Sequence, residues 1–170
     1  MGAESHRQQA RQPVICAIIT VSDTRTEAND TSGKTMRELL TQAGHQVGFY
    51  TIVKDEPDDI RKLMDHLATT QIVQAVLLNG GTGISRRDTT YEAISGLLEK
   101  KLDGFGELFR MLSYQDIGAA AMLSRAVAGT YRDLMVFSTP GSTAAVRLAM
   151  EKLIVPELSH LVWEVWRQKK

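Results

Sequence analysis

The sequence has little cysteine and no excess of charge of either sign. It contains one cysteine, Cys16, among 170 residues, which excludes an internal disulfide framework and a zinc site built from several cysteines. Cys16 lies inside an apolar run, so we expect a buried structural thiol. Lysine plus arginine equals aspartate plus glutamate at 20 each. The chain therefore lacks the broad basic field of a protein that binds nucleic-acid phosphates, and we expect no nucleic-acid partner.

Long apolar runs are missing as well. None approaches the roughly 20 residues that a membrane helix needs, and residues 1–12 contain no apolar core of a signal peptide. The hydrophobic content of 43% and the modest numbers of glycine (13) and proline (4) argue against global disorder. We therefore expect a cytoplasmic protein without a membrane contact. Residues 1–12 are expected to form a flexible N-terminal arm, and residues 13–170 a single domain.

Strand-like and helical patterns alternate along the chain. A segment with helical spacing follows each of the first strand-like runs, and Pro57 suits the start of one of these helices. A further helix is expected after "PGST". We expect Pro156 to kink or restart that helix. The pattern leaves the shape of residues 102–123 open. The strand-like runs are 14–21, 46–53 and 74–79, with two more strands around a turn at 131–133. This alternation predicts an α/β fold, a single-domain three-layer sandwich with a mostly parallel sheet.

The stretch "ANDTSGKT" (28–35) resembles the end of a nucleotide-binding P-loop. A P-loop needs a glycine-rich turn directly between strand and helix. Here Ala28 stands at the first glycine position, and six residues separate the stretch from the strand end at Val21. Several acids also lie where phosphates would sit. We therefore interpret the stretch as an acidic loop capped onto a helix by Asp30 or Ser32.

A more informative stretch is "NGGTGISRRDTTYEAI" (79–94), which follows the third expected strand. In a parallel sheet, ligands bind outside the carboxyl ends of the strands. Glycines at 80, 81 and 83 would let backbone amides approach an anion closely, beside the start of the next helix. Arg86 and Arg87 would supply compensating charge. The alternative is a tight turn with no ligand.

Two carboxylates and a second turn complete this predicted edge. Thr89 with Glu92 fits a capping box at the start of the next helix, which would leave Asp88 free to hold magnesium. The alternative is that Asp88 itself caps this helix. Asp55 is either functional or one of several acids at a helix start. In "TPGST", Ser142 caps a helix and would receive a second anionic group, or serves only as a cap. Together these features predict a substrate with several phosphates and a bound metal ion.

Seven motifs, in order from Val14 to about Leu158, resemble the MoaB/MogA family of molybdenum cofactor biosynthesis proteins. The short chain is more similar to the B-type than to the longer MogA-type members. The motifs are "TVSDTR", "DTSGKTMRELL", "IVKDE", "LLNGGTGISRRDTTYEAI", "DGFGELFRMLS", "AMLSRAVAG" and "STPGSTAAVRLAMEKLI".

The resemblance implies a molybdopterin-binding fold and adenylyl transfer, in which the terminal phosphate of molybdopterin attacks the α-phosphate of Mg-ATP. Asp55 and Asp88 match the family's essential acids, with Mg²⁺ as the metal they would hold. The remaining implied site residues contact the substrate and the nucleotide. They are Ser22, Asp23, Ser32 and Gly33 beside the nucleotide, Gly80, Gly81, Thr82 and Gly83 in the substrate loop, and Pro140, Gly141 and Ser142 in a second part of the pocket.

The resemblance also implies self-association as a trimer or hexamer, for which the apolar final helix with Trp163 and Trp166 would provide surface. Two further interpretations stay open beside the adenylyltransferase. One is a catalytically weak paralogue that binds molybdopterin. The other is an oligomeric carrier or scaffold, because related domains occur in such proteins.

Overall fold

Six strands form one sheet in the order β2-β1-β3-β6-β5-β4. The structure is a computed structural model and describes residues 12–167, so the predicted arm lies almost wholly outside the described residues. Neighbouring strands among β1, β2, β3 and β6 run parallel, whereas β5 runs antiparallel to both β6 and β4. The predicted mostly parallel sheet is confirmed. The strands are β1 (Ile15–Val21), β2 (Gln46–Val53), β3 (Ala75–Asn79), β4 (Lys100–Lys101), β5 (Val127–Tyr131) and β6 (Leu134–Thr139).

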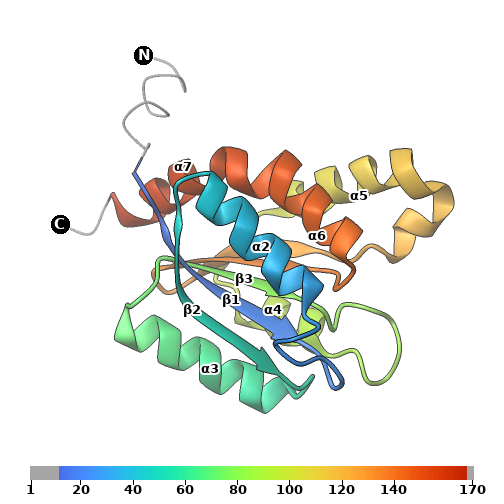
Figure 1. The fold of residues 1–170 in the computed structure, drawn as a ribbon, viewed down its shortest axis with the longest axis horizontal. Helices are drawn as coiled ribbons and strands as arrows, with labels where there is room; N and C mark the ends of the chain where they lie inside the picture. The colour runs from blue at the N-terminus through green and yellow to red at the C-terminus, as the bar shows by residue number, and fades with distance from the viewer. Residues whose placement is uncertain (1–11, 168–170) are drawn as a thin grey trace.

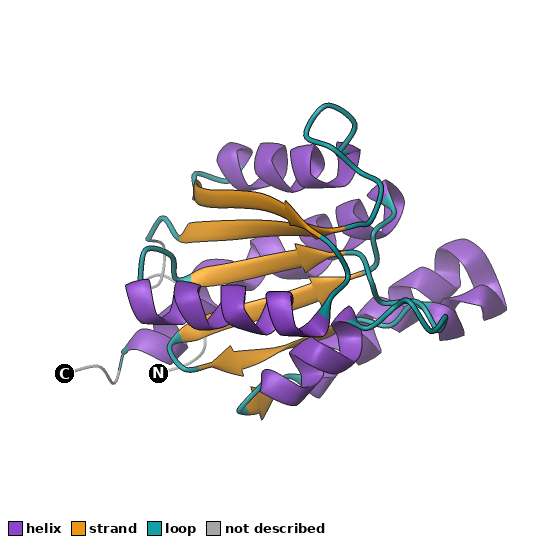
Figure 2. Cartoon of the chain, turned by 90° about the horizontal axis from the view of Figure 1, so that it is seen from below, coloured by secondary structure: helices purple, strands orange, loops and turns teal. Residues whose placement is uncertain are grey.

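Helices cover both faces of the sheet and make the predicted three layers (Figure 1). One face packs against α2, α5, α6 and α7, and the other packs against α3 and α4. Figure 2 shows the sheet between these two layers. The helices are α2 (Thr31–Gln42), α3 (Pro57–Thr70), α4 (Thr90–Leu97), α5 (Asp103–Ile117), α6 (Thr143–Ala149) and α7 (Val155–Trp166), with the 3₁₀ segment η1 (Gly118–Leu123) and the π-helical turn η2 (Met150–Ile154).

The central strand β1 is buried on both faces. Cys16 and Ile18 belong to the core on the α2 side, while Ala17 and Ile19 belong to the core on the α3 side. This explains why the strand is a continuous apolar run rather than an alternating one. Burial raises the pKa of the Cys16 thiol to about 12, so the thiol is protonated and structural, as expected.

His45 joins the start of β1 to the chain before β2. Its Nδ1 accepts a hydrogen bond from the Val14 N–H at 3.1 Å, so the ring is neutral at that nitrogen. Burial lowers the pKa of His45 below its ordinary value of 6.5. His45 is 8% exposed and so belongs to the interior of the protein. His66 is exposed, and the half-buried His160 contacts Glu157.

The segment 102–123, whose shape the sequence left open, forms α5 and η1. Phe105 and Phe109 hold α5 to the core, where the Phe105 ring meets Phe137 at a centroid distance of 5.4 Å. Gly118, with a φ of 62°, ends the helix. Near Pro156 the last helix widens into the π-helical turn η2 before α7 begins, so the predicted break is a change of helical pitch.

The final helix does not provide the exposed apolar surface that the sequence suggested. Trp166 is half-buried, and its Nε1 donates a hydrogen bond to the Asp133 carbonyl at 2.9 Å. Within residues 12–167, the large apolar side chains that are exposed include none from α7 and cluster on α5 and η1. No helix in this described range is long and apolar enough to cross a membrane.

Candidate functional site

The glycine turn after β3 lies against the turn after β6. Gly80 and Gly81 have φ values of 99° and 67°, and a Cβ atom on Gly80 would overlap the Val21 carbonyl. The Gly80 N–H donates to the Thr139 carbonyl at 3.0 Å, and a Cβ on Gly141 would lie 3.1 Å from Gly80 Cα. The two predicted anion-binding turns are therefore in direct backbone contact at the carboxyl edge of the sheet.

Asp55 fixes the start of α4 from across this edge. Its buried carboxylate accepts hydrogen bonds from the Thr89 N–H at 3.2 Å, the Thr89 hydroxyl at 2.7 Å and the Thr90 hydroxyl at 3.0 Å. The predicted capping box between Thr89 and Glu92 is wrong. Thr89 turns to Asp55 instead, and Glu92 pairs with Arg125. A buried charged acceptor forms the stronger hydrogen bond, and it comes from a residue 34 positions away.

Asp88 closes the other end of the glycine turn. Its Oδ2 accepts hydrogen bonds from the N–H and hydroxyl of Ser85 at 3.1 and 2.5 Å. Asp88 is therefore less free than predicted, although its Oδ1 accepts no hydrogen bond from residues 12–167. A Cβ on Gly83 would lie 2.5 Å from Oδ2. Both acids thus flank the turn, with Asp55 beside Gly81 and Asp88 beside Gly83.

The carboxylates of Asp55 and Asp88 fit a magnesium ion only together with oxygen atoms of a substrate. In the described part of the chain, no three His, Cys, Asp or Glu side chains are grouped so as to hold a metal ion. Magnesium, however, is commonly bound through one or two carboxylates plus substrate phosphates. Asp88 Oδ1 is suited to such a contact, whereas both Asp55 oxygens already accept hydrogen bonds. The metal site stays a prediction.

The start of α2 is built around Asp30, which caps the helix through Gly33 N–H at 2.9 Å. Thr20 and Tyr50 each donate a hydroxyl hydrogen bond of 2.7 Å to the same carboxylate. Burial raises the pKa of Asp30, but the hydrogen bonds from Thr20, Gly33 and Tyr50 outweigh it and hold the pKa below its usual range. Of the two caps that the sequence left open, Asp30 and Ser32, the structure has Asp30.

Lys34 does not act as a P-loop lysine. Its Nζ donates to the Ala28 carbonyl at 2.8 Å, and so turns back over its own loop. Asn79, at the end of β3, donates to the Thr20 hydroxyl at 2.9 Å. Its buried Oδ1 accepts no hydrogen bond within residues 12–167. The rejection of a P-loop from the sequence agrees with this geometry.

Arg25 joins the N-terminus of α2 to the turn after β6, a role that the sequence did not reveal. Its guanidinium contacts Asp30 at 3.4 Å, the Ser32 hydroxyl at 3.1 Å and the Gly141 carbonyl at 3.3 Å. The Ser32 hydroxyl donates to the same Gly141 carbonyl at 2.7 Å. The predicted residues Ser32, Gly33 and Gly141 are therefore brought together. No local spacing indicates Arg25, because Gly141 lies 116 positions away.

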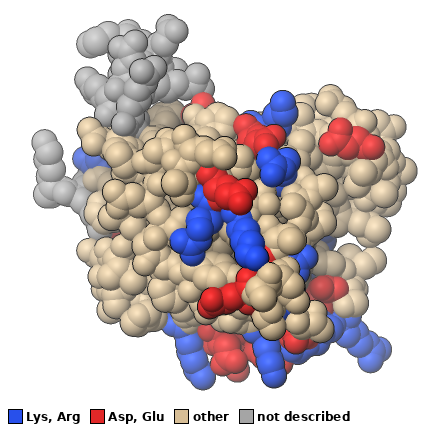
Figure 3. All heavy atoms as spheres, in the orientation of Figure 1, with Lys and Arg blue, Asp and Glu red and all other residues tan. Residues whose placement is uncertain are grey.

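Arg87 forms ion pairs with acidic side chains of the protein and is not left free to bind a substrate. It forms a bidentate pair with Asp23 at 2.6 and 2.8 Å and contacts Glu56 at 2.8 Å. The hydrogen bond from Arg87 holds the pKa of Asp23 below its usual range. Asp23 Oδ1 also accepts from the Asp55 N–H at 3.3 Å. Figure 3 shows basic and acidic side chains side by side on the face it displays.

Two other predicted residues of these loops, Ser22 and Arg86, differ in what they contact. The Ser22 hydroxyl oxygen accepts from the N–H groups of Thr24 and Arg25 at 3.2 and 3.1 Å, which shapes the loop after β1. Arg86 forms no hydrogen bond or ion pair with other residues of the described range, in contrast to Arg87. Of the two arginines expected to balance substrate charge, Arg86 is the one without a protein partner there.

Arg125 holds the glycine turn from the opposite side. Its Nε donates to the Thr82 carbonyl at 2.8 Å and its NH2 group to the Gly83 carbonyl at 2.6 Å. It also pairs with Glu92 at 2.5 Å and lies 4.5 Å from the centre of the Tyr91 ring. The hydrogen bond from Arg125 lowers the pKa of Glu92. Arg125 is the second site residue that sequence reasoning left unassigned.

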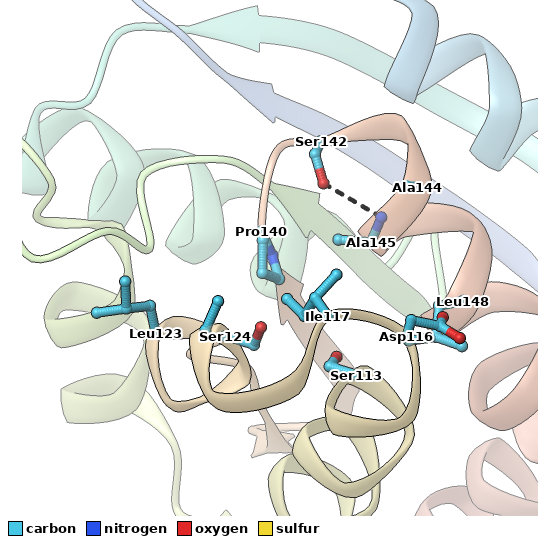
Figure 4. A pocket seen from close by; sticks show the side chains of 11 residues that line it. Ser113, Asp116, Ile117, Leu123, Ser124, Pro140, Ser142, Ala144, Ala145 and Leu148 are labelled. Atoms are coloured by element: carbon cyan, nitrogen blue, oxygen red, sulfur yellow. Dashed lines mark hydrogen bonds between the residues drawn. The ribbon is translucent and has the colours of Figure 1, made fainter.

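A pocket of about 300 Å³ opens beside the second turn, between α6 and the α5–η1 segment (Figure 4). Pro140 and Ser142 line it, and the Ser142 hydroxyl oxygen caps α6 by accepting from the Ala145 N–H at 3.2 Å. Ile117 and Leu123 form part of the opposite wall. The same turn therefore borders the glycine turn on one side and a largely apolar cavity on the other.

Comparison with known proteins agrees with this arrangement of sheet, turns and helix starts. The sequence profile of a family described as a probable molybdopterin binding domain matches residues 17–160. The chain belongs to this family. One similar protein is molybdenum cofactor biosynthesis protein B of Bacillus cereus, which is 54% identical to this chain over 169 residues. The alignment covers 99% of this chain and 100% of the relative. The protein of the same name from Bacillus subtilis (strain 168) is 54% identical over 170 residues, with the same coverage.

Solved structures show the same relationship. A crystal structure of molybdenum cofactor biosynthesis protein B superposes with a TM-score of 0.90 at 55% identity and covers 93% of this chain and 99% of its own. The tungsten cofactor synthesizing protein MoaB from Pyrococcus furiosus gives a TM-score of 0.82 at 36% identity, covering 91% and 98%. The resemblance to the MoaB/MogA family of molybdenum cofactor biosynthesis proteins and the predicted molybdopterin-binding fold are therefore confirmed.

Proposed function

We propose that this protein binds molybdopterin and Mg-ATP and transfers the adenylyl group to molybdopterin. An oxygen of the terminal phosphate of molybdopterin attacks the α-phosphorus of ATP, the bond from that phosphorus to the bridging oxygen of pyrophosphate breaks, and pyrophosphate leaves. The observation that carries the proposal is the contact between Gly80 and Gly141, which joins two glycine-containing turns into one polar edge. We propose the cytoplasm as the place of this reaction.

In this proposal the backbone does most of the binding. Amides of Gly80, Gly81, Thr82 and Gly83 approach phosphate oxygens without side-chain obstruction, and the start of α4 adds a favourable dipole. The turn of Pro140, Gly141 and Ser142 contacts the pterin part of the substrate in the adjoining pocket.

The nucleotide side of the site is proposed to lie at the loop after β1 and the start of α2. Ser22, Asp23, Ser32 and Gly33 line it, and Arg25 fixes this loop to Gly141. Holding the terminal phosphate of molybdopterin in line with the α-phosphate of ATP supplies most of the rate enhancement in such a transfer.

The two acids have different proposed duties. Asp88 retains an oxygen without a protein donor and is the residue suited to hold Mg²⁺ with the substrate phosphates. Bound magnesium would offset the negative charge on the reacting phosphate oxygens. Asp55 acts as the second acid by fixing Thr89 and Thr90, and so determines where the start of α4 and the glycine turn lie.

The test is a pyrophosphate-release assay with purified protein, molybdopterin and magnesium, run with and without ATP. The proposal expects release only when pterin, ATP and magnesium are all present. A matched assay without pterin controls for simple ATP hydrolysis. Pyrophosphate release that does not depend on the pterin contradicts the proposal.

A second candidate is a catalytically weak protein that binds molybdopterin, either alone or as an oligomeric carrier or scaffold. The saturation of the Asp55 carboxylate by Thr89 and Thr90 favours it, since a carboxylate so engaged is poorly placed to take up a metal. Tight pterin binding measured by fluorescence, together with no turnover at any ATP concentration, would support this candidate over the first. In either case we propose self-association as a trimer or hexamer.

A further inference from the structure

Three polar side chains lie in a row inside the protein, on one face of the sheet at its carboxyl end. They come from neighbouring strands: Tyr50 from β2, Thr20 from β1 and Asn79 from β3. Thr20 and Asn79 stand opposite each other in the register of β1 and β3, and they are 0% and 1% exposed. Alternation along each strand turns the row toward α2, because Ile18 and Leu77 belong to the core on that side.

The Thr20 hydroxyl group joins Asp30, at the start of α2, to Asn79, at the end of β3. It donates to Asp30 Oδ2 at 2.7 Å and accepts from Asn79 Nδ2 at 2.9 Å. A hydroxyl group has one proton to donate, and the carboxylate accepts it, so toward Asn79 the oxygen is the acceptor. The start of α2 lies beside the end of β1 (Figure 1). Asp30, Thr20 and Asn79, here called the interior network, are each at most 1% exposed, so bulk water does not reach these hydrogen bonds.

Thr20 is the partner that fixes the orientation of the Asn79 side chain. Within residues 12–167, Asn79 Oδ1 accepts no hydrogen bond, and the other contact of Nδ2 is with Met36 Sδ at 3.7 Å. A thioether sulfur is a weak acceptor. Loss of the Thr20 hydroxyl would therefore leave a buried amide without a strong partner, which is unfavourable.

Asn79 passes this restraint to the glycine turn. It directly precedes Gly80, whose N–H donates to the Thr139 carbonyl at 3.0 Å and whose Cβ position would overlap the Val21 carbonyl. Little space is left around Gly80, so a displacement of Asn79 also displaces the turn.

The start of α2 reaches the same glycine by an outer route. The Ser32 hydroxyl donates to the Gly141 carbonyl at 2.7 Å, and Gly141 packs against Gly80. The interior network and this outer route together connect the proposed nucleotide side of the site to the proposed substrate turn.

The interior network specifies positions better than apolar side chains would. An apolar core at this place would avoid the free-energy cost of burying a carboxylate and an amide. Each hydrogen bond of the network, however, has a preferred distance and angle. Thr20 therefore fixes the start of α2, the end of β1 and the end of β3 relative to one another.

We propose that Thr20 is a positioning residue that couples the start of α2 to the glycine turn, and that this coupling makes the binding of nucleotide and molybdopterin cooperative. A nucleotide at the start of α2 restrains Asp30 and, through Thr20 and Asn79, holds the turn in its binding position. The pterin then has less motion to restrain when it binds, and by linkage it tightens nucleotide binding by the same factor. The cooperativity rests on the proposed function, whereas the coupling between α2 and the turn does not.

The first experiment measures amide hydrogen exchange in the full-length protein without ligands. Thr20→Val removes the hydroxyl at nearly constant volume. It is expected to speed exchange of the Gly80 N–H about tenfold, the effect of losing one buried hydrogen bond to a charged group. The Ile60 N–H, which donates to the Glu56 carbonyl at the start of α3, is expected to be unchanged. Thr20→Ser keeps the hydroxyl and is expected to match the wild type; a Thr20→Ser protein that behaves as Thr20→Val overturns the role of the hydroxyl.

Thr35→Val is the matched control for this experiment. Thr35 is also buried, but its hydroxyl donates to the Thr31 carbonyl of its own helix at 2.9 Å, so exchange at Gly80 is expected to stay at the wild-type rate. Asn79→Leu interrupts the interior network at its other end and serves as a second variant should Thr20→Val fail to fold. A folded network variant with wild-type exchange at Gly80, or with an equal acceleration at the α3 amide, overturns the coupling.

The second experiment measures molybdopterin affinity by pterin fluorescence, with and without an ATP analogue that has a methylene bridge between its α- and β-phosphates. The bridge prevents the release of pyrophosphate. The wild type is expected to bind the pterin about tenfold more tightly when the analogue and magnesium are present, a usual size for coupling between two sites. This factor is expected to fall to about one in Thr20→Val and to be retained in Thr20→Ser.

The outcomes separate the coupling from the proposed function. A wild type whose pterin affinity does not respond to the analogue, or a Thr20→Val protein that keeps the full factor, overturns the cooperativity. A wild type that binds neither ligand contradicts the proposed function and the cooperativity together, while the exchange experiment still decides the coupling between α2 and the turn. Coupled binding without pyrophosphate release from ATP counts against the adenylyl transfer alone.

Discussion

Gly80 and Gly141 touch through their backbones, with 3.1 Å between Gly80 Cα and the position that a Cβ on Gly141 would take. The contact joins the turn after β3 to the turn after β6. A Cβ on Gly141 would press on Gly80, and a Cβ on Gly80 would overlap the Val21 carbonyl, so the position of the glycine turn depends on both glycines.

Replacing Gly80 with alanine is expected to destabilise the protein by about 3 kcal/mol or more, because the Cβ would overlap the Val21 carbonyl and the φ of 99° is unfavourable for alanine. Chemical unfolding measures this change. Gly96→Ala is the control. Gly96 lies inside α4 with open space around its Cβ position, so the substitution should stabilise the protein by roughly 0.5–1 kcal/mol. A Gly80→Ala protein as stable as the wild type would contradict the geometry of this turn.

Asp88→Asn is expected to abolish pterin-dependent pyrophosphate release while changing the free energy of unfolding by less than about 1 kcal/mol. An asparagine oxygen can still accept the hydrogen bonds from Ser85, but it lacks the charge needed to hold a divalent cation. Asp55→Asn should lower both turnover and stability, by about 1–3 kcal/mol for the latter, because it weakens a buried cap of α4. Turnover of Asp88→Asn at the wild-type rate would exclude the proposed role of Asp88.

Arg125→Lys is expected to lower kcat/KM by about tenfold or more, because one ammonium group cannot replace the paired contacts with the Thr82 and Gly83 carbonyls. Steady-state kinetics and a thermal melt separate misplacement of the turn from unfolding. Arg61→Lys is the comparison variant, since Arg61 pairs with Asp58 at the surface of α3, and it should behave as the wild type. Equal losses in the two variants would argue against a specific role of Arg125.

The stability of the fold should decrease below about pH 6.5 because of His45. Burial keeps the His45 ring neutral in the folded state, whereas in the unfolded chain the ring takes up a proton once the pH falls below its ordinary pKa of 6.5. The unfolded state then binds more protons, so acidification favours unfolding until the lowered pKa of the folded state is reached.

His45→Asn provides the comparison for this pH dependence. The asparagine side-chain oxygen can take the place of Nδ1 as acceptor for the Val14 N–H, and it does not titrate. Urea unfolding of both proteins between pH 5 and pH 8 isolates the contribution of His45 from that of other groups. Parallel stability curves for the two proteins over this range would show that His45 is not the cause.

Local patterns were sufficient to predict the elements that depend on local chemistry. The β2 range of residues 46–53 agrees with the structure, Pro57 starts α3, and Asp30 caps α2. These features follow from burial periodicity and from hydrogen bonds within one turn, both of which the sequence contains directly.

Features that depend on distant partners could not be predicted in this way. Thr89 and Glu92 have the spacing of a capping box, yet each finds a stronger partner elsewhere, in Asp55 and Arg125. Arg25 binds Gly141 across the fold. Several large apolar side chains of α5 and η1 are exposed, so the apolar residues of this segment do not fall on a single helical stripe.

The two-residue strand β4 limits how this sheet can grow. It consists of Lys100 and Lys101, both exposed, at one margin of the sheet. A strand from another molecule added there would gain few backbone hydrogen bonds and would have to accommodate two adjacent ammonium groups, a known protection against edge-to-edge aggregation. Because α5 begins two residues later, the chain leaves this margin of the sheet after only two residues, and polymerisation by strand addition there is disfavoured.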